Sequence, residues 1–262
     1  DSVGFAVWQQ INQAGATQVM ASRYIDGDWQ APQLLSAPST FGDPFGPQVV
    51  VHSNGEATAI WCAVNQFGGR RIEFNYAENG VWLAEPRSFS PSLNTVTNIQ
   101  LATDGTTRAV AVWQDQGTFG DINKKSVSAV EIVGGVSNAP PTQLAFVDSG
   151  AVEFFNPRIA MGRDGKALAV WREQTLGGLG ANRIRTWARP YVLNTWGEVQ
   201  EIDNRQANLN DANSCAVALG AEGQAVVVWT ARTAESSIVA RHTQNFVDVN
   251  GWTPPETISN DP

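Results

Sequence analysis

The chain has 262 residues, 42% of them hydrophobic, and carries 17 Lys and Arg against 25 Asp and Glu, a net charge of −8. That length is sufficient to bury a large hydrophobic core. The acidic balance, without a basic stripe, excludes nucleic acid and anionic membrane surfaces as partners. No apolar run approaches the roughly 18 residues of a spanning helix, so membrane insertion is not expected.

A strand-like phrase that ends in tryptophan occurs five times along the chain. It reads F-A-V-W, A-T-A-I-W, A-V-A-V-W, A-L-A-V-W and A-V-V-V-W, ending at Trp8, Trp61, Trp113, Trp171 and Trp229. The spacings between these inner tryptophans are 53, 52, 58 and 58 residues. A fixed period of this length with strand chemistry is typical of propeller blades. The sequence therefore predicts an all-β fold, a five-bladed β-propeller of four-stranded antiparallel blades.

The repeat runs from end to end, which predicts a single domain over residues 1–262. Its units cover about 1–46, 47–96, 97–156, 157–214 and 215–262. The first unit lacks an innermost strand at the N-terminus, because Asp1 and Ser2 align with the first turn of the other units. The last residues, Ile258–Pro262, stop where a next innermost strand should begin. Either the first blade has three strands or is completed by this tail, or the chain is part of a longer array.

Each unit contains further strand and turn signals around the tryptophan phrase. The innermost strand ends in N-G, D-G or E-G pairs, as at Asn54 and Asp104, which favour tight turns. A second tryptophan follows the third strand, and we expect this outer row to pack against the neighbouring blade. The outer row consists of Trp29, Trp82, Trp196 and Trp252.

Polar residues recur where the long connections between strands are expected. One set opens the innermost strand and a second stands two residues after the inner tryptophan. The first set is Gln48, Asn98 and Arg158, and the second is Gln10, Asp115 and Glu173. Variable loops on a rigid scaffold commonly carry function, so these six residues are candidate ligand-binding residues. The alternative interpretation is a solvated rim.

Aromatic residues in or near the long connections between strands could supply contact area to a ligand, since rings offer apolar surface and polar groups fix the ligand's orientation. They are Phe41, Phe45, Phe119, Phe154 and Phe155.

The repeat pattern resembles the sialidase-like, bacterial neuraminidase-repeat β-propellers found in secreted bacterial proteins and lectins. The resemblance covers the whole chain, although the Asp box of that family, S-x-D-x-G-x-T-W, is not matched. Here D-G is contiguous, as at Asp104 and Asp164. The resemblance implies a secreted or cell-surface bacterial protein with lectin-like carbohydrate binding or sialidase-like activity.

No catalytic constellation is evident in the sequence. The three tyrosines close a repeated strand, as Tyr76 does, which indicates a structural role. Neither His52 nor His242 is placed in the sequence to act as the base of a Ser-His-Asp site. The carboxylates stand beside turn glycines, where they do not form the acid and base pair of a glycosidase.

No metal site or cofactor is expected either. His clusters are absent, and Cys62 and Cys215 indicate buried free thiols. A structural calcium ion in the Asp43 loop, G-D-P-F-G, is the one metal site left open against a simple turn aspartate.

These observations lead to one main hypothesis and two alternatives. The first, which we favour over an enzyme, is a non-catalytic recognition module that binds carbohydrate or a protein surface through the long-loop face. The second is a glycoside-processing enzyme, either a five-bladed glycosidase or a sialidase-like protein. The third is an architectural domain of a larger surface or toxin-like protein.

Overall fold

A computed structural model describes residues 3–36, 42–64, 68–89, 95–117, 121–137, 140–176, 183–203, 214–232 and 236–259. All regular structure in these residues is β-strand, and no helix occurs among them. Accordingly, none of the described segments forms a helix long and apolar enough to cross a membrane. The all-β prediction is confirmed.

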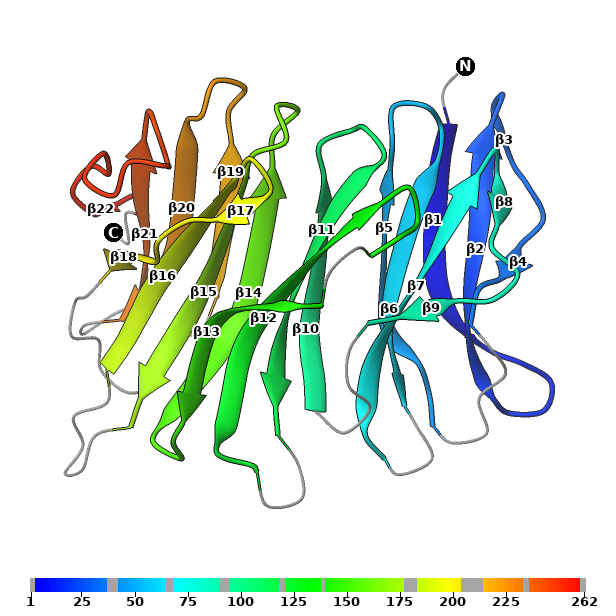
Figure 1. Cartoon of the computed structure of the whole chain (residues 1–262), viewed down its shortest axis with the longest axis horizontal. Helices are drawn as coiled ribbons and strands as arrows, with labels where there is room; N and C mark the ends of the chain where they lie inside the picture. Colours follow the sequence, from blue (N-terminus) through cyan, green and yellow to red (C-terminus); the bar gives the residue numbers. More distant parts are fainter. Residues whose placement is uncertain are drawn as a thin grey trace.

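The strands form five antiparallel sheets in chain order, which we call blades 1 to 5 (Figure 1). Blade 1 contains β1 (Val3–Ile11), β2 (Thr17–Ile25), β3 (Asp28–Trp29) and β4 (Gln33–Leu34). Blade 2 contains β5 (Phe45–Val51), β6 (Ala57–Val64), β7 (Arg70–Glu78), β8 (Val81–Trp82) and β9 (Arg87–Ser88). Blade 3 contains β10 (Thr95–Thr103), β11 (Arg108–Gln116), β12 (Lys124–Val133) and β13 (Thr142–Asp148).

Blades 4 and 5 continue the series. Blade 4 contains β14 (Val152–Met161), β15 (Ala167–Thr175), β16 (Arg183–Val192), β17 (Thr195–Trp196) and β18 (Gln200–Asp203). Blade 5 contains β19 (Cys215–Leu219), β20 (Ala225–Arg232), β21 (Ser236–Thr243) and β22 (Glu256–Thr257). In blades 2 to 5 the tryptophan-ended strand is second in its sheet, between an innermost strand and a third strand.

Glycines at positive φ close the turns between the first and second strands of blades 2 to 5. The φ angles are 80° at Gly55, 83° at Gly105, 77° at Gly165 and 92° at Gly223. Residues with a Cβ rarely adopt this conformation, which explains why each turn ends in glycine. The contiguous D-G pairs are therefore turn residues.

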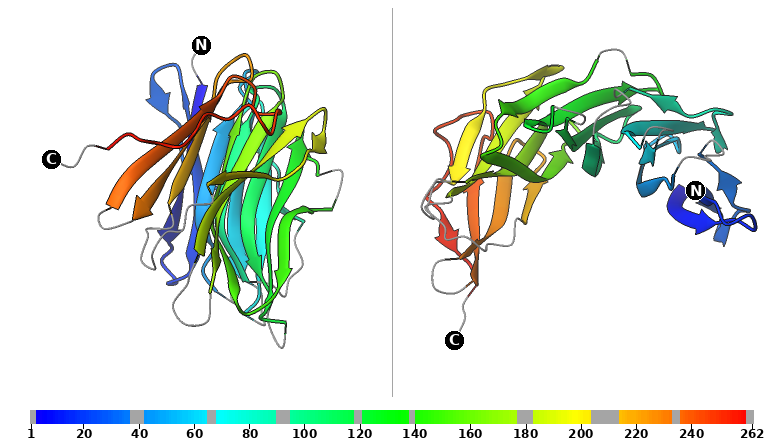
Figure 2. Two further views of the ribbon diagram at one scale, coloured as in Figure 1. Left: turned by 90° about the vertical axis from the view of Figure 1, so that its left-hand side faces the viewer. Right: turned by 90° about the horizontal axis from the view of Figure 1, so that it is seen from below.

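The five blades follow one another along an arc, with their innermost strands on its concave side (Figure 2). The first and last blades lie apart at the two ends of this arc (Figure 2). The structure therefore shows five propeller-like sheets in sequence and does not show the closed ring of five blades that the sequence predicts.

The hydrophobic core lies between the blades, where each of blades 2 to 5 packs its inner tryptophan against the blade before it. Trp61 packs with Val19 and Ala21 of blade 1, and Trp229 packs with residues of blade 4. Trp113 and Trp171 occupy the same place in blades 3 and 4. These four side chains are at most 2% exposed. The inner row thus wedges neighbouring blades together and leaves no ring face for a sugar.

The outer tryptophans follow the same rule with one exception. Trp82 and Trp252 are buried against the preceding blade, and Trp196 is half-buried. Trp29 is 58% exposed. The prediction that all four anchor against a neighbour is wrong for Trp29, because blade 1 has no preceding blade in this structure.

Among the described residues, blade 1 has no innermost strand. Its first strand, β1, carries Trp8 and pairs only with β2, as the sequence alignment requires. The end of the described chain stays on blade 5, where the Ile258 backbone N–H donates to the Ile238 carbonyl oxygen at 2.9 Å. Completion of blade 1 by the tail is therefore not seen up to Ser259; residues 260–262 lie outside the described residues.

Candidate functional site

Three innermost strands, which lie on the concave side of the arc, carry the same irregularity in their first half. The register of β5, β10 and β14 shifts after Phe45, Thr97 and Phe155. The residue that follows has positive φ in each case: 62° at Gly46, 54° at Asn98 and 46° at Asn156. Glycine and asparagine tolerate this conformation best. The result is a β-bulge in each of three adjacent blades, a feature that re-aims side chains.

Because of the bulges, the register of the innermost strands differs from the register expected from the sequence. Gln48 pairs with Ile60 and Arg158 with Val170, each one residue before an inner tryptophan. In blade 3 the residue that pairs at this place is Gln100, opposite Val112. The prediction that Asn98 stands in register with Gln48 and Arg158 is wrong, because Asn98 is the bulge residue itself. Asn98 aligns instead with Gly46 and Asn156.

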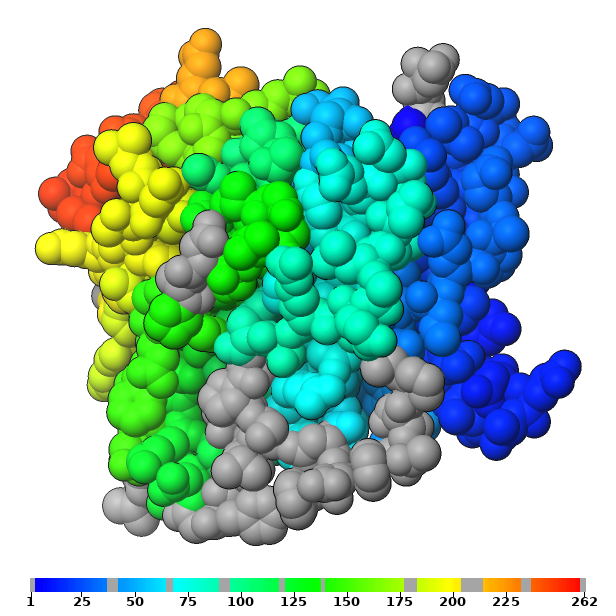
Figure 3. Space-filling model, turned by 45° about the vertical axis from the view of Figure 1, so that its right-hand side comes forward, coloured from blue at the N-terminus to red at the C-terminus, as the bar shows by residue number. Residues whose placement is uncertain are grey.

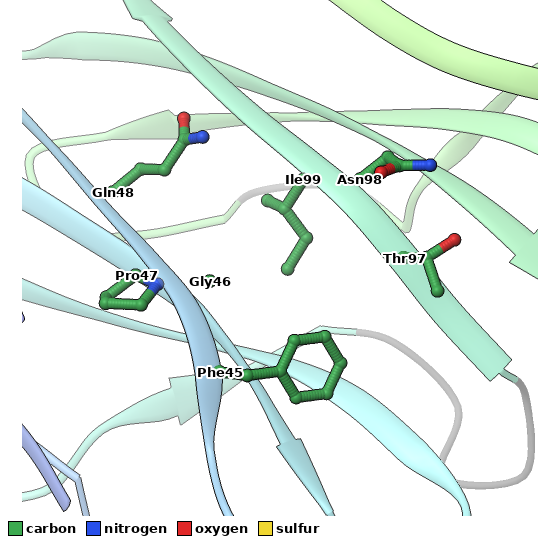
Figure 4. Close-up of a pocket in the computed structure, with 7 residues that line it drawn as sticks. All are labelled: Phe45, Gly46, Pro47, Gln48, Thr97, Asn98 and Ile99. Atoms are coloured by element: carbon green, nitrogen blue, oxygen red, sulfur yellow. The ribbon is translucent and has the colours of Figure 1, made fainter. Parts of the chain in front are cut away.

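A hollow of about 360 Å³ lies between β5 and β10 at this level (Figure 4). Its lining residues are Phe45, Gly46, Pro47, Gln48, Thr97, Asn98 and Ile99. Figure 4 shows the Phe45 ring and the Ile99 side chain projecting into the space between the two strands. Gln48 and Asn98, two of the six candidate residues, thus border one depression.

An arginine lies over the aromatic ring in this hollow. The Arg70 guanidinium carbon is 4.7 Å from the centre of the Phe45 ring, which is within cation–π distance. Arg70 begins β7 and Phe45 begins β5, so blade 2 supplies both groups. The ring offers apolar contact area, and a guanidinium can form paired hydrogen bonds with a carboxylate.

The two amides that border the hollow each take part in a hydrogen bond, and Figure 4 shows the Asn98 amide on the side of β10 away from β5. The Leu101 backbone N–H donates to Gln48 Oε1 at 3.2 Å, which ties blade 2 to blade 3. Asn98 Nδ2 donates to Gln114 Oε1 at 3.1 Å. An amide has both donor and acceptor atoms, so Gln48 retains its NH₂ and Asn98 its carbonyl oxygen for further hydrogen bonds.

The other four candidate residues lie elsewhere. Asp115 is 8% exposed, and its Oδ2 accepts from Trp113 Nε1 at 2.7 Å, so it holds the inner tryptophan of blade 3. Gln10 plays the same part in blade 1, where Trp8 Nε1 donates to Gln10 Oε1 at 3.2 Å. Glu173 and Arg158 are half-buried on β15 and β14 of blade 4.

Glu173 is a half-buried carboxyl whose pKa is shifted by its surroundings. Burial raises the pKa of its carboxyl above the usual range, while Arg185 opposes the shift. A carboxyl with a raised pKa can act as a general acid. Among the described residues, no carboxylate lines the hollow between β5 and β10, so the structure does not join Glu173 to the Gln48 and Asn98 amides.

The candidate aromatics divide between core and rim. Phe154 is 1% exposed in the core between blades 3 and 4, and Phe155 is half-buried. Phe45 lines the hollow. Phe41 and Phe119 lie outside the described residues.

Sequence reasoning missed Arg70, Thr97 and the bulges themselves. A signal for the bulges exists, since Gly46, Asn98 and Asn156 stand at one fixed distance before the inner tryptophans. Nothing in the sequence places Arg70 over Phe45, because that contact depends on how β5 and β7 lie on either side of β6.

At the end of the blades that carries the turns between first and second strands, tyrosine hydroxyls pair with carboxylates. These pairs do not provide a nucleophile. The Tyr76 hydroxyl donates to Glu56, and the Tyr191 hydroxyl donates to Glu131 Oε1 at 2.8 Å. Burial and the adjacent carboxylates raise the pKa of both tyrosines. Both hydroxyls therefore stay protonated, which suits hydrogen-bond donation and not nucleophilic attack.

His52 lies at the same end of the blades and should make stability depend on pH. Its ring nitrogens contact Thr103 Oγ1 at 3.0 Å and Thr58 Oγ1 at 2.9 Å. Burial lowers the pKa of His52 below its ordinary value of 6.5, although Glu56 and Asp104 oppose the shift. The unfolded chain therefore binds the proton first, and the free energy of unfolding should fall as the pH drops below about 6.5.

The free energy of unfolding should change by no more than about 1.4 kcal/mol per pH unit through His52 alone. Urea unfolding between pH 7.5 and pH 5.5 measures this slope, and His52→Gln should flatten it. His242→Gln is the matched control, since His242 is exposed. An equal slope in all three proteins would contradict the assignment.

The cysteines are free and buried, as expected. Burial raises the pKa of Cys62 to about 12 and that of Cys215 to about 11, so both remain thiols. Within the described ranges, no three His, Cys, Asp or Glu side chains gather where they could hold a metal ion. The calcium site at Asp43 stays a prediction.

No protein-family model matches the sequence, and no curated protein matches it by sequence. Solved structures do resemble it. An ulvan lyase bound to -[GlcA(1-4)Rha3S]- gives a TM-score of 0.58 at 9% identity, over 93% of this chain and 62% of the lyase. A mutant of the B. megaterium levansucrase gives 0.52 at 9% identity, over 99% of this chain and 80% of that chain.

A sialidase is also among the solved structures that resemble the chain, with a lower TM-score. The Hadza microbial sialidase Hz136 gives a TM-score of 0.49 at 11% identity, over 99% of this chain and 57% of the sialidase. At these identities the likenesses show the fold alone. The chain spans about three fifths of the length of the ulvan lyase. The solved structures that it resembles are mostly glycan-processing enzymes with propeller-like folds.

Proposed function

We propose that this chain is a glycan-processing β-propeller protein that holds a carbohydrate in the hollow between β5 and β10. The observation that carries the proposal is that Phe45, Gln48 and Asn98 line that depression, while Arg70 lies over the Phe45 ring. A sugar ring has an apolar face that stacks on an aromatic ring and hydroxyls that pair with amides. The guanidinium suits a sugar that carries a carboxylate.

The glycan-processing part of the proposal draws on the fold. The ulvan lyase and the levansucrase resemble this chain over nearly all of its length. A polysaccharide ligand also agrees with the secreted or cell-surface location that we propose for the protein.

A non-catalytic recognition module is the second candidate. The observation in its favour is that no carboxylate, histidine or tyrosine of the described ranges lines the hollow. Such a module would bind the same sugars without converting them.

The experiment offers the protein a panel of polysaccharides that includes a glucuronate–rhamnose sulfate polymer and a levan. Binding is followed by calorimetry, and conversion by new reducing ends and by the ultraviolet absorbance of a new carbon–carbon double bond. Conversion supports the glycan-processing protein, and binding without conversion supports the recognition module. Neither binding nor conversion with any polysaccharide contradicts both.

Substitution at Asn98 tests the position of the site. Asn98→Gly keeps the positive φ but removes the amide, so it should weaken binding about tenfold, the loss of one or two hydrogen bonds. Gln48→Ala should weaken it similarly. Asn79→Gly is the matched control, because Asn79 has φ of 53° in a turn on the opposite face. Equal losses at Asn98 and Asn79 would place the ligand elsewhere.

A further inference from the structure

One interface occurs four times in the molecule, between each blade and the next. The later blade presents its inner tryptophan, joined by an outer tryptophan in blades 2, 4 and 5, and the earlier blade presents a flat face of small and branched residues. Between blades 4 and 5, Trp229 and Trp252 pack with Leu168, Val170 and Ala188. Trp252 Nε1 also donates to Gln200 Oε1 of blade 4 at 2.6 Å. The centre of the flat face of blade 4 is buried by this contact, with Leu168 and Val170 at 0% exposure.

Blade 5 has a flat face of the same kind, but no blade of the described chain covers it. Val226 aligns with Leu168 and is 37% exposed, and Ile238 aligns with buried Thr186 and is 38% exposed. By the strand register the face comprises Ala216, Ala218, Val226, Val228, Thr230, Ile238, Ala240 and His242. None of these eight residues is Asp, Glu, Lys or Arg. The face is therefore an apolar surface of the type that marks an interaction site.

Blade 1 has the complementary face, which no other described blade covers. Trp8 and Trp29 stand where Trp229 and Trp252 stand in blade 5. Trp8 and Trp229 lie on the equivalent strand, and Trp29 pairs with Tyr24 as Trp252 does with Thr243. Trp29 is 58% exposed, against 6% for Trp252. Tyr24 lies beside Trp29 with ring centroids 5.3 Å apart. In the space-filling view, blade 1 (blue) forms one end of the molecule, beside blade 2 (cyan) (Figure 3).

We propose that the tryptophan face of blade 1 docks on the flat face of blade 5 of a second copy of this chain, head to tail. The pairing repeats the interface that the chain builds four times between its own blades. The two faces of one molecule lie at opposite ends of the arc, so they do not meet within it (Figure 2). An interface of two different faces joins copies into rings or open chains.

The experiment uses the full chain with one charge placed on either face. Trp29→Lys blocks the blade 1 face, and Ile238→Lys blocks the blade 5 face. Both positions are exposed, so neither substitution disturbs the fold of a single molecule. Leu193→Lys is the control, since Leu193 is 90% exposed in a turn of blade 4 away from both faces.

Analytical ultracentrifugation over a range of concentrations gives the answer. Wild type and Leu193→Lys should associate as the concentration rises, and each blocked variant alone should remain a monomer. An equimolar mixture of the two blocked variants should form a dimer that grows no further, because it contains one intact face of each kind. A wild-type protein that stays monomeric at all concentrations would overturn the proposal, whether its faces remain free or meet within one chain. Association of either blocked variant alone would overturn it as well.

Discussion

Replacing Trp113 by Ala should lower the free energy of unfolding by on the order of 3–5 kcal/mol. The side chain is 1% exposed and packs between blades 2 and 3, with the Phe89 ring centroid 5.7 Å from its own. Truncation leaves a cavity at the interface and also removes the N–H that donates to Asp115. A buried carboxylate without its donor adds to the loss. Urea unfolding followed by circular dichroism measures the change.

The matched control is Trp8→Ala, the same change at the equivalent position of blade 1. Trp8 is only partly buried, because blade 1 has no preceding blade in this structure. Its truncation should cost about 1 kcal/mol in dilute protein, where no second copy is docked. Equal losses at Trp8 and Trp113 would mean that blade 1 is covered in the folded molecule, and the open arc would be wrong.

Phe154→Ala should destabilise the protein by a similar amount, on the order of 3–5 kcal/mol, without a specific effect on ligand binding. Phe154 is 1% exposed and packs with Val112, Leu144 and Trp171 between blades 3 and 4. Its ring is thus part of the core and not available to a ligand. Thermal or urea unfolding gives the stability, and calorimetry with a bound polysaccharide gives the affinity.

Phe155→Ala is the neighbouring control, since Phe155 begins the bulge of β14 and is only half-buried. We expect a loss of about 1 kcal/mol there. If Phe155→Ala destabilised the fold as much as Phe154→Ala, the assignment of Phe154 to the core and Phe155 to the rim would be wrong.

The two pairs of substitutions separate the core from the rim of the molecule. Residues that repeat in register near the mouth, such as Asp115 and Gln10, serve inner tryptophans. Residues at the bulges, such as Asn98, border the hollow. A ligand search is therefore best directed at blades 2 and 3, on the concave side of the arc.

The sequence by itself determined the strands, their grouping and the inner tryptophan wedges. These follow from local patterns that repeat: alternation sets the faces of a strand, and glycine after Asn54 or Asp104 sets a turn. The buried state of Trp61 or Trp171 follows from that pattern, because an aromatic of this size on a central strand must be covered by the adjacent blade.

Only the tertiary structure decided where residues at the same position of the repeat differ in burial, register or contacts. Trp29 and Trp252 share one place in the repeat, yet one is exposed and the other buried, because burial depends on a preceding blade that the repeat does not encode. Asn98 is out of register with Gln48 because a bulge changes register without changing composition. Arg70 and Phe45 meet because β5 and β7 flank β6 in one sheet, a contact between residues far apart in sequence that no local pattern specifies.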